Sequence, residues 1–446
     1  MPLYHISIFH KSNGPDAVQM RAFIWTKRGI RATIIKTDRS VCFYKPSRNE
    51  DHAMSMKISP LTTPWRIPSP TRPLYRGSDG LWHVTGYPEA RAILLGDVVQ
   101  AGFKAETMQR IPRRWRIEKP VLFQDGEAHR EQRRQTARFF TPTAVQERYL
   151  PLMQKVASQA VEELNHKRQA DLNRLAAHMA TGVVAEVVGL TESPLEAMAA
   201  RLDRILHADL DIAITFSRLP AYLRVQWLIF QFYRKDVKPA IAARRTHPRE
   251  DVLSHLLAQG ASEQSILVEC ITYGAAGMVT TQEFICVAAW HMLREPALRE
   301  RFLSGDREAR YAILYEILRL EPVVGHLFRR AVSDLTIESE GTQVIIPAGS
   351  LIDLHLHEIN ADARVVGAEP FTFNDARPLE KGVNRAVMGF GNGPHRCVGE
   401  YLAMAETEVF LGQVLALPGL HILKEPRLGR NETIQGYELR DFIVGL

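Results

Sequence analysis

The sequence predicts a mainly α-helical fold with a minor β-sheet region, and three observations support this prediction. Residues 142–165 and 170–190 carry apolar side chains at three- and four-residue spacing, which is typical of helices with one buried face. Residues 262–293 are mostly apolar on all sides, which indicates a helix that crosses the centre of the molecule. Segments with strand character are few, and most of them fall within residues 335–356 and 420–445.

The remaining elements are expected in the following order. LWHVTG at residues 81–86 has strand character, and Pro88–Leu95 is predicted to be a helix because proline is favoured in the first turn. A long helical stretch is predicted over 218–245, and a short amphipathic helix over 248–259. The segment 420–445 is expected to form a C-terminal hairpin.

Residues 1–53 differ from the rest of the chain. They mix polar stretches such as KPSRNEDH with short apolar pieces, and they show no sustained helical pattern. A proline-rich segment then leads into the helical region, and residues before proline favour extended conformations. We expect 1–53 to be a poorly ordered extension and 54–446 to be a single domain; a small added strand pair is the alternative for 1–53.

Composition narrows the class of protein. The chain has 446 residues, of which 46% are hydrophobic and 24% charged, as in ordinary globular proteins. Its four cysteines have no paired spacing, so the sequence predicts neither a disulfide framework nor a zinc site of the CxxC type. No apolar run is long enough for a membrane anchor, and no signal peptide is recognisable. We expect a cytoplasmic protein, and the net charge of +6 does not indicate nucleic acid as a partner.

The most distinctive stretch is VMGFGNGPHRCVGE at residues 387–400. Glycines let backbone N–H groups approach an anion closely, and a helix N-terminus favours negative charge. Both features are expected to lower the pKa of Cys397 and stabilise its thiolate. The sequence therefore indicates a stabilised thiolate whose binding partner is open at this point, and a buried structural cysteine beside a glycine turn is the alternative.

This loop resembles the haem-binding pattern FxxGxHxCxG of the cytochrome P450 family, through Phe390, Gly393, His395, Cys397 and Gly399. The resemblance covers roughly residues 60–446. It implies the cytochrome P450 fold and a haem b cofactor whose iron is held by the Cys397 thiolate. It also implies that Phe390 packs near the sulfur and that the backbone following Gly391 donates hydrogen bonds to it.

A second group of residues resembles the structural network of that family. Glu316 and Arg319 are three residues apart on one predicted helix face, about 80 residues before the cysteine, and Arg377 resembles the third member. A buried carboxylate shared by two arginines is expected to hold the haem side of the fold. Taken alone, the ExxR spacing is common and is usually a solvated pair.

Four basic residues resemble the partners of the two haem propionates. His129 and Arg133 are one helical turn apart, Arg329 occupies the arginine position of an RxAxxD strand, and His395 lies in the cysteine loop. Without the resemblance, each would be interpreted as an exposed basic residue.

The distal helix departs from the family pattern at one position. Ala276 and Gly277 match the small residues that allow close approach of haem and oxygen, and Thr280 matches the alcohol that organises proton delivery. The family's acid is replaced by Val279, which cannot relay a proton. Glu283 could replace the acid through water, the substrate could organise water, or the enzyme could use peroxide or catalyse a rearrangement.

The resemblance implies a haem-thiolate monooxygenase that acts on a small hydrophobic molecule and receives electrons from a separate ferredoxin and ferredoxin reductase. The alternatives are a haem-thiolate peroxygenase, isomerase or dehydratase, and a non-catalytic haem-binding protein. A ferredoxin is expected on a basic face formed by Arg130, Arg134 and Arg138, for which a solubilising surface is the alternative. The substrate pocket is expected to involve 101–124, 210–235 and the following side chains: Met278, Val279, Val323, Val324, Leu327 and Ile434, with His326 and Tyr437 as possible polar contacts.

Overall fold

The computed structural model describes residues 6–12, 18–26, 29–37, 40–43, 72–103, 119–206, 208, 219–431 and 434–446, and in the first four of these ranges it describes the backbone alone. The chain divides into two compact units, Met1–Lys57 and Ile58–Leu446.

In the first unit, four strands form an antiparallel sheet in the order β1-β2-β3-β4. Their bounds are Ile6–Ser12, Val18–Thr26, Gly29–Thr37 and Ser40–Phe43. The expected domain boundary after residue 53 lies outside the described residues, so the assignment of 1–53 as a separate extension stays a prediction.

The second unit is mainly helical, as the sequence predicts. Its α-helices are α1 Tyr87–Leu95, α3 Gly126–Thr136, α4 Pro142–Ala144, α5 Leu150–Lys167, α6 Leu172–Val188, α7 Leu195–Leu206, α8 Leu219–Phe232, α9 Lys238–Thr246, α10 Val252–Ala258, α11 Glu263–Gly274, α12 Thr280–Arg294, α13 Pro296–Ser304, α14 Arg307–Leu320, α15 Leu356–Ile359, α16 Ala363–Val366 and α17 Glu400–Val414. Short 3₁₀ segments are η2 Val121–Phe123, η3 Ala137–Phe140 and η8 Gly393–His395, and π-helical turns are η4 Val145–Tyr149, η6 Tyr233–Val237 and η7 Ala275–Val279.

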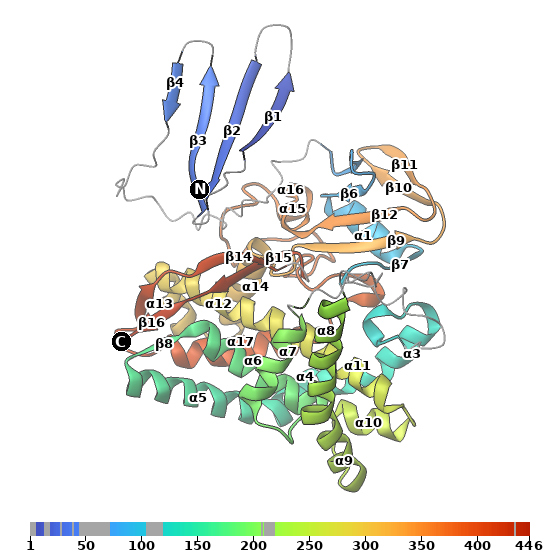
Figure 1. Ribbon diagram of the computed structural model, residues 1–446, viewed down its shortest axis with the longest axis vertical. Coiled ribbons are helices and arrows are strands. Elements are labelled where there is room, and N and C mark those ends of the chain that lie inside the picture. The colour runs from blue at the N-terminus through green and yellow to red at the C-terminus, as the bar shows by residue number, and fades with distance from the viewer. Residues whose placement is uncertain are drawn as a thin grey trace. The chain divides into compact units, whose positions relative to one another are not determined.

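The strands of the second unit form four small sheets. Their bounds are β5 Leu74–Arg76, β6 Trp82–Val84, β7 Val98–Gln100, β8 Gln169–Asp171, β9 His326–Ala331, β10 Leu335–Ser339, β11 Thr342–Ile346, β12 Leu351–His355, β13 His421–Lys424, β14 Arg427–Asn431, β15 Gly436–Arg440 and β16 Ile443–Gly445. The largest sheet has the order β5-β6-β12-β9-β7, and the others are β10-β11, β13-β16-β8 and β14-β15. Figure 1 shows β9 and β12 beside α1, with α5 and α9 among the helices farther from this sheet.

Apolar periodicity and capping residues explain the central helices. Ser262 caps α11 by accepting a hydrogen bond from Ser265 N, and Asp306 caps α14 by accepting one from Ala309 N. Most of α12 is buried, in agreement with a sequence that is apolar on all sides, and it packs against α6 and α17 in the main core. The helix predicted over 262–293 is interrupted by the π-helical turn η7. In the described residues, no helix has the length and apolar character needed to cross a membrane.

Strand β9 presents its two faces to different surroundings. Leu327, Arg329 and Ala331 are buried, and they alternate with His326, Phe328 and Arg330, which are half-buried. This alternation follows from the two-residue period of a strand. It places Leu327 and Arg329 on the opposite face of the sheet from His326.

Candidate active site

A cavity of about 900 Å³ lies inside the helical unit, and it is lined mainly by apolar side chains. One wall is formed by α11, η7 and the start of α12, and the opposite wall by the cysteine loop and the start of α17. Strand β9 and helix α8 complete the lining. The volume is typical of a site for small molecules or a cofactor.

The cysteine loop owes its shape to glycines. Gly391 and Gly393 have φ angles of 70° and 68°, which residues with a side chain rarely adopt. A Cβ atom at Gly393 would also collide with the carbonyl oxygen of Leu94. The loop then returns, because Cys397 N donates a hydrogen bond to Phe390 O at 2.8 Å. This turn places the Cys397 side chain at the cavity.

Cys397 is an exposed residue that lines the cavity. Burial raises the pKa of Cys397, and the Gly399 N–H and Arg133 oppose this rise without cancelling it. The expectation that the loop lowers the pKa of Cys397 is therefore wrong, because the loss of hydration raises the pKa more than the nearby amides lower it. A coordinated metal cation would still displace the proton, since metal-bound thiols are deprotonated.

Two arginines reach the cavity without a carboxylate partner. The Arg329 side chain is almost fully buried, its guanidinium donates to Gln100 Oε1 and to Phe328 O at 2.8 Å, and burial lowers its pKa to about 10. Arg133 donates to the carbonyl oxygen of Arg396. Neither guanidinium forms an ion pair with a carboxylate in the described part of the chain, and a buried cation without such a partner is costly. These side chains are therefore suited to binding an anionic group.

Two histidines lie beside Arg133. The His129 and His395 rings stack with their centroids 4.1 Å apart, and His395 Nε2 lies 3.2 Å from Asp125 Oδ1. Burial, followed by the charges of His395 and Arg133, lowers the pKa of His129 to about 4. Both histidines line the cavity, so the four side chains predicted to bind propionates lie around one space.

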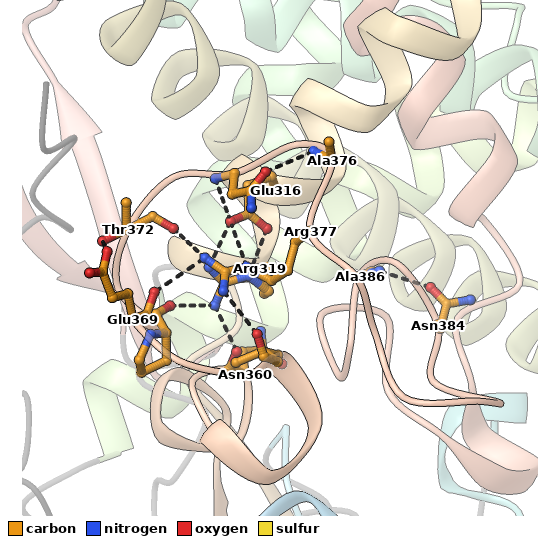
Figure 2. Close-up of polar contacts among 12 residues, drawn as sticks. Glu316, Arg319, Asn360, Glu369, Thr372, Ala376, Arg377, Asn384 and Ala386 are labelled. Atoms are coloured by element: carbon orange, nitrogen blue, oxygen red, sulfur yellow. Dashed lines mark hydrogen bonds and ion pairs between the residues drawn. The ribbon is translucent and has the colours of Figure 1, made fainter.

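The predicted structural network is present as a buried cluster (Figure 2). Glu316 accepts hydrogen bonds from Arg319 Nε at 2.7 Å and Nη2 at 2.8 Å, from Arg377 Nε at 3.3 Å and from Asn374 N at 3.0 Å. Arg319 Nη1 donates to the carbonyl oxygens of Asn360 and Pro370. The cluster ties α14 to the segment that precedes the cysteine loop.

The distal wall is shaped by the π-helical turn η7. Ala276, Gly277 and Thr280 line the cavity, and the Thr280 hydroxyl donates to Ala276 O at 2.6 Å. A Cβ atom at Gly277 would collide with Val184 of α6, so this glycine also permits close helix packing. Val279 is buried in a core cluster and does not line the cavity. Residue 279, at which the family pattern has an acid, therefore faces the core.

Glu283 lies on the same side of the distal helix as Val279, and it is not among the residues that line the cavity. It is fully buried, accepts a hydrogen bond from Leu439 N at 2.8 Å and pairs with Arg440 Nη1 at 2.5 Å. This ion pair links α12 to strand β15. The structure therefore does not bring Glu283 together with Thr280 at the cavity.

Glu406 on α17 is an acid that the sequence reasoning missed. It lines the cavity, it is almost fully buried, and its Oε2 atom has no hydrogen-bond partner in the described part of the chain. Burial raises its pKa well above the usual value, although a hydrogen bond from Thr281 opposes this rise. Burial therefore favours the neutral form of this carboxyl. The sequence signal was a glutamate in the mostly apolar stretch YLAMAETEVFLG at residues 401–412, which also contains Glu408.

The other predicted pocket residues divide into three groups. Val323, Val324, Leu327 and Ile434 line the cavity, as expected. Met278 and Val279 pack in the core, and His326 lies on the opposite face of β9. The side chain of Tyr437 and residues 104–118 of the expected pocket mouth lie outside the described residues.

Two of the three arginines of the expected basic face form ion pairs with neighbouring glutamates of α3. Arg130 Nη2 lies 2.6 Å from Glu127 Oε2, and Arg134 Nη2 lies 2.8 Å from Glu131 Oε1. Arg138 stacks over the Phe139 ring at 4.9 Å. These exposed glutamates reduce the positive charge that the sequence indicated for this face.

Comparisons with known proteins agree with the fold. The family model for cytochrome P450 matches residues 310–422, which contain both the Glu316 network and the cysteine loop. The chain is similar to cytochrome P450 proteins. The biotin biosynthesis cytochrome P450 of Bacillus subtilis (strain 168) is 26% identical over 368 residues, which cover 78% of this chain and 87% of that protein. The mycinamicin VIII C21 methyl hydroxylase of Micromonospora griseorubida is 27% identical over 257 residues, which cover 57% of this chain and 61% of that protein.

A solved structure of P450BioI in complex with hexadec-9Z-enoic acid ligated acyl carrier protein matches with a TM-score of 0.67 and 24% identity. The match covers 84% of this chain and 95% of that chain, and it shows a shared P450 fold. The family model and the curated relatives, rather than this structural likeness, support an oxidoreductase of the P450 monooxygenase type.

The residues around the cavity fit the haem-thiolate group that the family implies. Cys397 offers a sulfur ligand, and the unpaired guanidiniums of Arg133 and Arg329 suit two carboxylates. Phe390 lines the cavity and meets the Tyr315 ring edge to face at 6.5 Å, which fixes its position beside the loop. Gly391 supplies the positive φ that turns the loop toward the cavity.

Proposed function

We propose that this P450 inserts one oxygen atom of O2 into a hydrophobic small organic molecule, with electrons from a separate ferredoxin and its reductase, in the cytoplasm. The main support is the apolar cavity, which has Cys397 on one wall and Thr280 on the other. The methyl hydroxylase among the relatives is consistent with this reaction. A haem held by Cys397 would supply the oxygen activation, and a thiolate ligand favours O–O cleavage.

Substrate binding is assigned to the apolar side chains of the distal wall, β9 and α8. Val323, Val324 and Leu327 follow the Glu316 network in sequence, and Ile229 of α8 faces the same space. Burial of apolar substrate surface against such a lining is favourable by about 25 cal/mol per Å². It also excludes water from the reacting centre. A hydrophobic substrate is therefore favoured over a charged one.

Proton delivery is assigned to hydroxyl groups of the distal helix. Thr280 holds its proton on Ala276 O in the described geometry, and its oxygen can accept a hydrogen bond from water in the cavity. Behind it, the Thr281 side chain is hydrogen-bonded to the carboxyl of Glu406, whose pKa is raised by burial. We assign Glu406 as the acid that resupplies protons to this wall, in place of the residue that the family has at position 279.

The first experiment is the absorption spectrum of dithionite-reduced protein with carbon monoxide, for the wild type and Cys397→Ala. A strongly red-shifted Soret band that requires the cysteine would support a thiolate-bound haem. Haem binding without that band in the wild type would contradict the assignment of Cys397. Hydrophobic compounds would then be screened by the change they cause in the Soret spectrum, and hits tested for oxygenated product with reduced ferredoxin.

A peroxygenase is the second candidate, and the core-facing Val279 is the observation that favours it. The two functions predict different oxidant requirements. A monooxygenase forms product from O2 and reduced ferredoxin, whereas a peroxygenase forms product at a comparable rate from hydrogen peroxide alone. A non-catalytic haem protein would bind one compound tightly and turn over none with either oxidant.

A further inference from the structure

We propose that His83, Asp353 and His355 form a zinc-binding site in the five-stranded sheet, separate from the haem cavity. The three side chains supply one ligand atom each, all within 4.8 Å of one another. None of them lines the cavity around Cys397. Two imidazoles and a carboxylate are ligands that zinc takes readily, with water in the fourth position.

The spacing of the three ligand atoms suits a tetrahedral ion. His83 Nδ1 lies 2.8 Å from His355 Nε2, and Asp353 Oδ2 lies 3.3 Å from His355 Nε2 and 3.8 Å from His83 Nδ1. Zinc bonds to nitrogen and oxygen of about 2.0–2.1 Å in tetrahedral geometry require ligand atoms roughly 3.3 Å apart. Shifts of about half an ångström would complete the triangle.

Strand register explains why these three side chains meet. In the parallel pair of β6 and β12, His83 is the register partner of Asp353, and His355 lies two residues further along the same face. In the antiparallel pair of β12 and β9, His326 is the partner of His355. Four polar side chains from three strands therefore share one face, although His83 and His355 are 272 residues apart in sequence.

Two outer contacts prepare the ligands for a metal. His83 Nε2 lies 3.1 Å from Asp79 Oδ2, so the carboxylate holds the ring proton on Nε2 and leaves Nδ1 free to bind. His326 Nδ1 lies 2.8 Å from Asp353 Oδ1, which orients the other carboxylate oxygen toward the site. Space for the first contact depends on Gly77, because a Cβ atom there would lie 2.6 Å from His83 Nε2.

The site is enclosed but reachable from solvent. The exposed side-chain fractions of His83, Asp353 and His355 are 12%, 9% and 4%. A bound ion would join β6 to β12 and, through Asp353 and His326, to β9. Because the other face of β9 carries Leu327 and Arg329, the ion would stiffen the strand that forms one wall of the haem cavity. The competing explanation is a hydrogen-bonded network in which His355 Nε2 donates to His83 Nδ1.

Zinc retention by the untagged, haem-loaded full chain tests the proposal. The protein is dialysed against zinc chloride and then metal-free buffer at fixed pH, and zinc is measured by mass spectrometry of the digested sample. The site predicts one zinc per chain in the wild type and in the control His421→Asn, which changes an exposed histidine. His83→Asn and His355→Asn should each lose it, and Asp79→Asn should bind about 10–100-fold more weakly. Equal retention in all variants, or none in the wild type, would overturn the proposal.

X-ray absorption at the zinc edge of the wild type provides a test that does not depend on the variants folding. Nitrogen and oxygen neighbours at about 2.0–2.1 Å with the outer scattering of two imidazoles are expected. Sulfur neighbours at about 2.3 Å would place the zinc on a cysteine and refute the assignment. The Soret spectrum and circular dichroism of each variant confirm that haem and fold are retained.

Discussion

The Glu316→Gln substitution is expected to destabilise the protein strongly, because Glu316 is the shared anion of two buried arginines. Both arginine partners lie on its carboxylate, with Arg319 Nε 2.7 Å from Oε2 and Arg377 Nε 3.3 Å from Oε1. Glutamine keeps one acceptor oxygen but turns an NH2 donor toward a guanidinium. Two buried positive charges then lack a counter-charge, which costs about 3–5 kcal/mol of unfolding free energy.

The assay is unfolding in guanidinium chloride of haem-loaded protein, followed by circular dichroism and by the Soret band. Glu308→Gln is the matched control, because Glu308 is an exposed glutamate in the same helix, α14. We expect the control to change the unfolding free energy by under about 1 kcal/mol, as exposed substitutions do. The slope of the transition must be unchanged for the midpoints to be compared.

A double-mutant cycle with Arg377→Gln sharpens the test. If Glu316 and Arg377 interact as the contacts indicate, the two losses are not additive, and the coupling is about 0.5–3 kcal/mol. A Glu316→Gln protein as stable as the control, or losses that simply add, would refute the interpretation that this carboxylate binds the two arginines together.

Three further outcomes are expected. Thr280→Ala should lower the amount of product formed per electron pair at least about tenfold without changing the carbon monoxide spectrum. Thr280→Ser should restore product formation because the hydroxyl is retained. An alanine variant that forms as much product per electron pair as the wild type would exclude the threonine from proton delivery. Glu406→Gln should slow oxygenation while leaving unfolding free energy nearly unchanged, since glutamine resembles the protonated acid; full activity would make Glu406 a structural residue. Burial raises the pKa of Glu269 to about 7, so its stabilising contribution is present below pH 4.5 and is lost as the pH rises through 7. The wild type should therefore lose up to about 3 kcal/mol between pH 4.5 and 7, and Glu269→Gln should lose less over the same interval; identical pH profiles would show that Glu269 titrates normally.

Local sequence signals predicted the helices and the cysteine loop well. The apolar pattern of 262–293 predicted a buried central helix, and the glycines before Cys397 predicted a tight loop at a helix start, which is where the structure has them. The resemblance to P450 proteins then selected His129 and Arg329, which lie around the same cavity. Each of these residues belongs to a motif with a fixed spacing, which can be recognised from the sequence alone.

The features that sequence reasoning missed depend on packing between distant segments. Glu283 was a reasonable relay by helical spacing, but Arg440 approaches it from β15 and makes it part of an ion pair. Glu406 reaches the cavity only because α17 packs against α12. The meeting of His83 with His355 depends on the pairing of β6 and β12, which no local pattern in the sequence specifies.

At the π-helical turn Ala275–Val279, residues that are neighbours in sequence face different parts of the structure. An ordinary α-helix turns about 100° per residue, so every residue inserted or removed rotates all that follow. Here the wider turn directs Thr280 to the cavity and leaves its neighbour Val279 in the core. A valine that replaces an acid is therefore compatible with the packing of the helix, and the proton supply can come from a different helix without disturbing the oxygen-binding wall. Adjacent residues of one helix therefore have different surroundings in this protein, with Val279 packed in the core and Thr280 at the cavity.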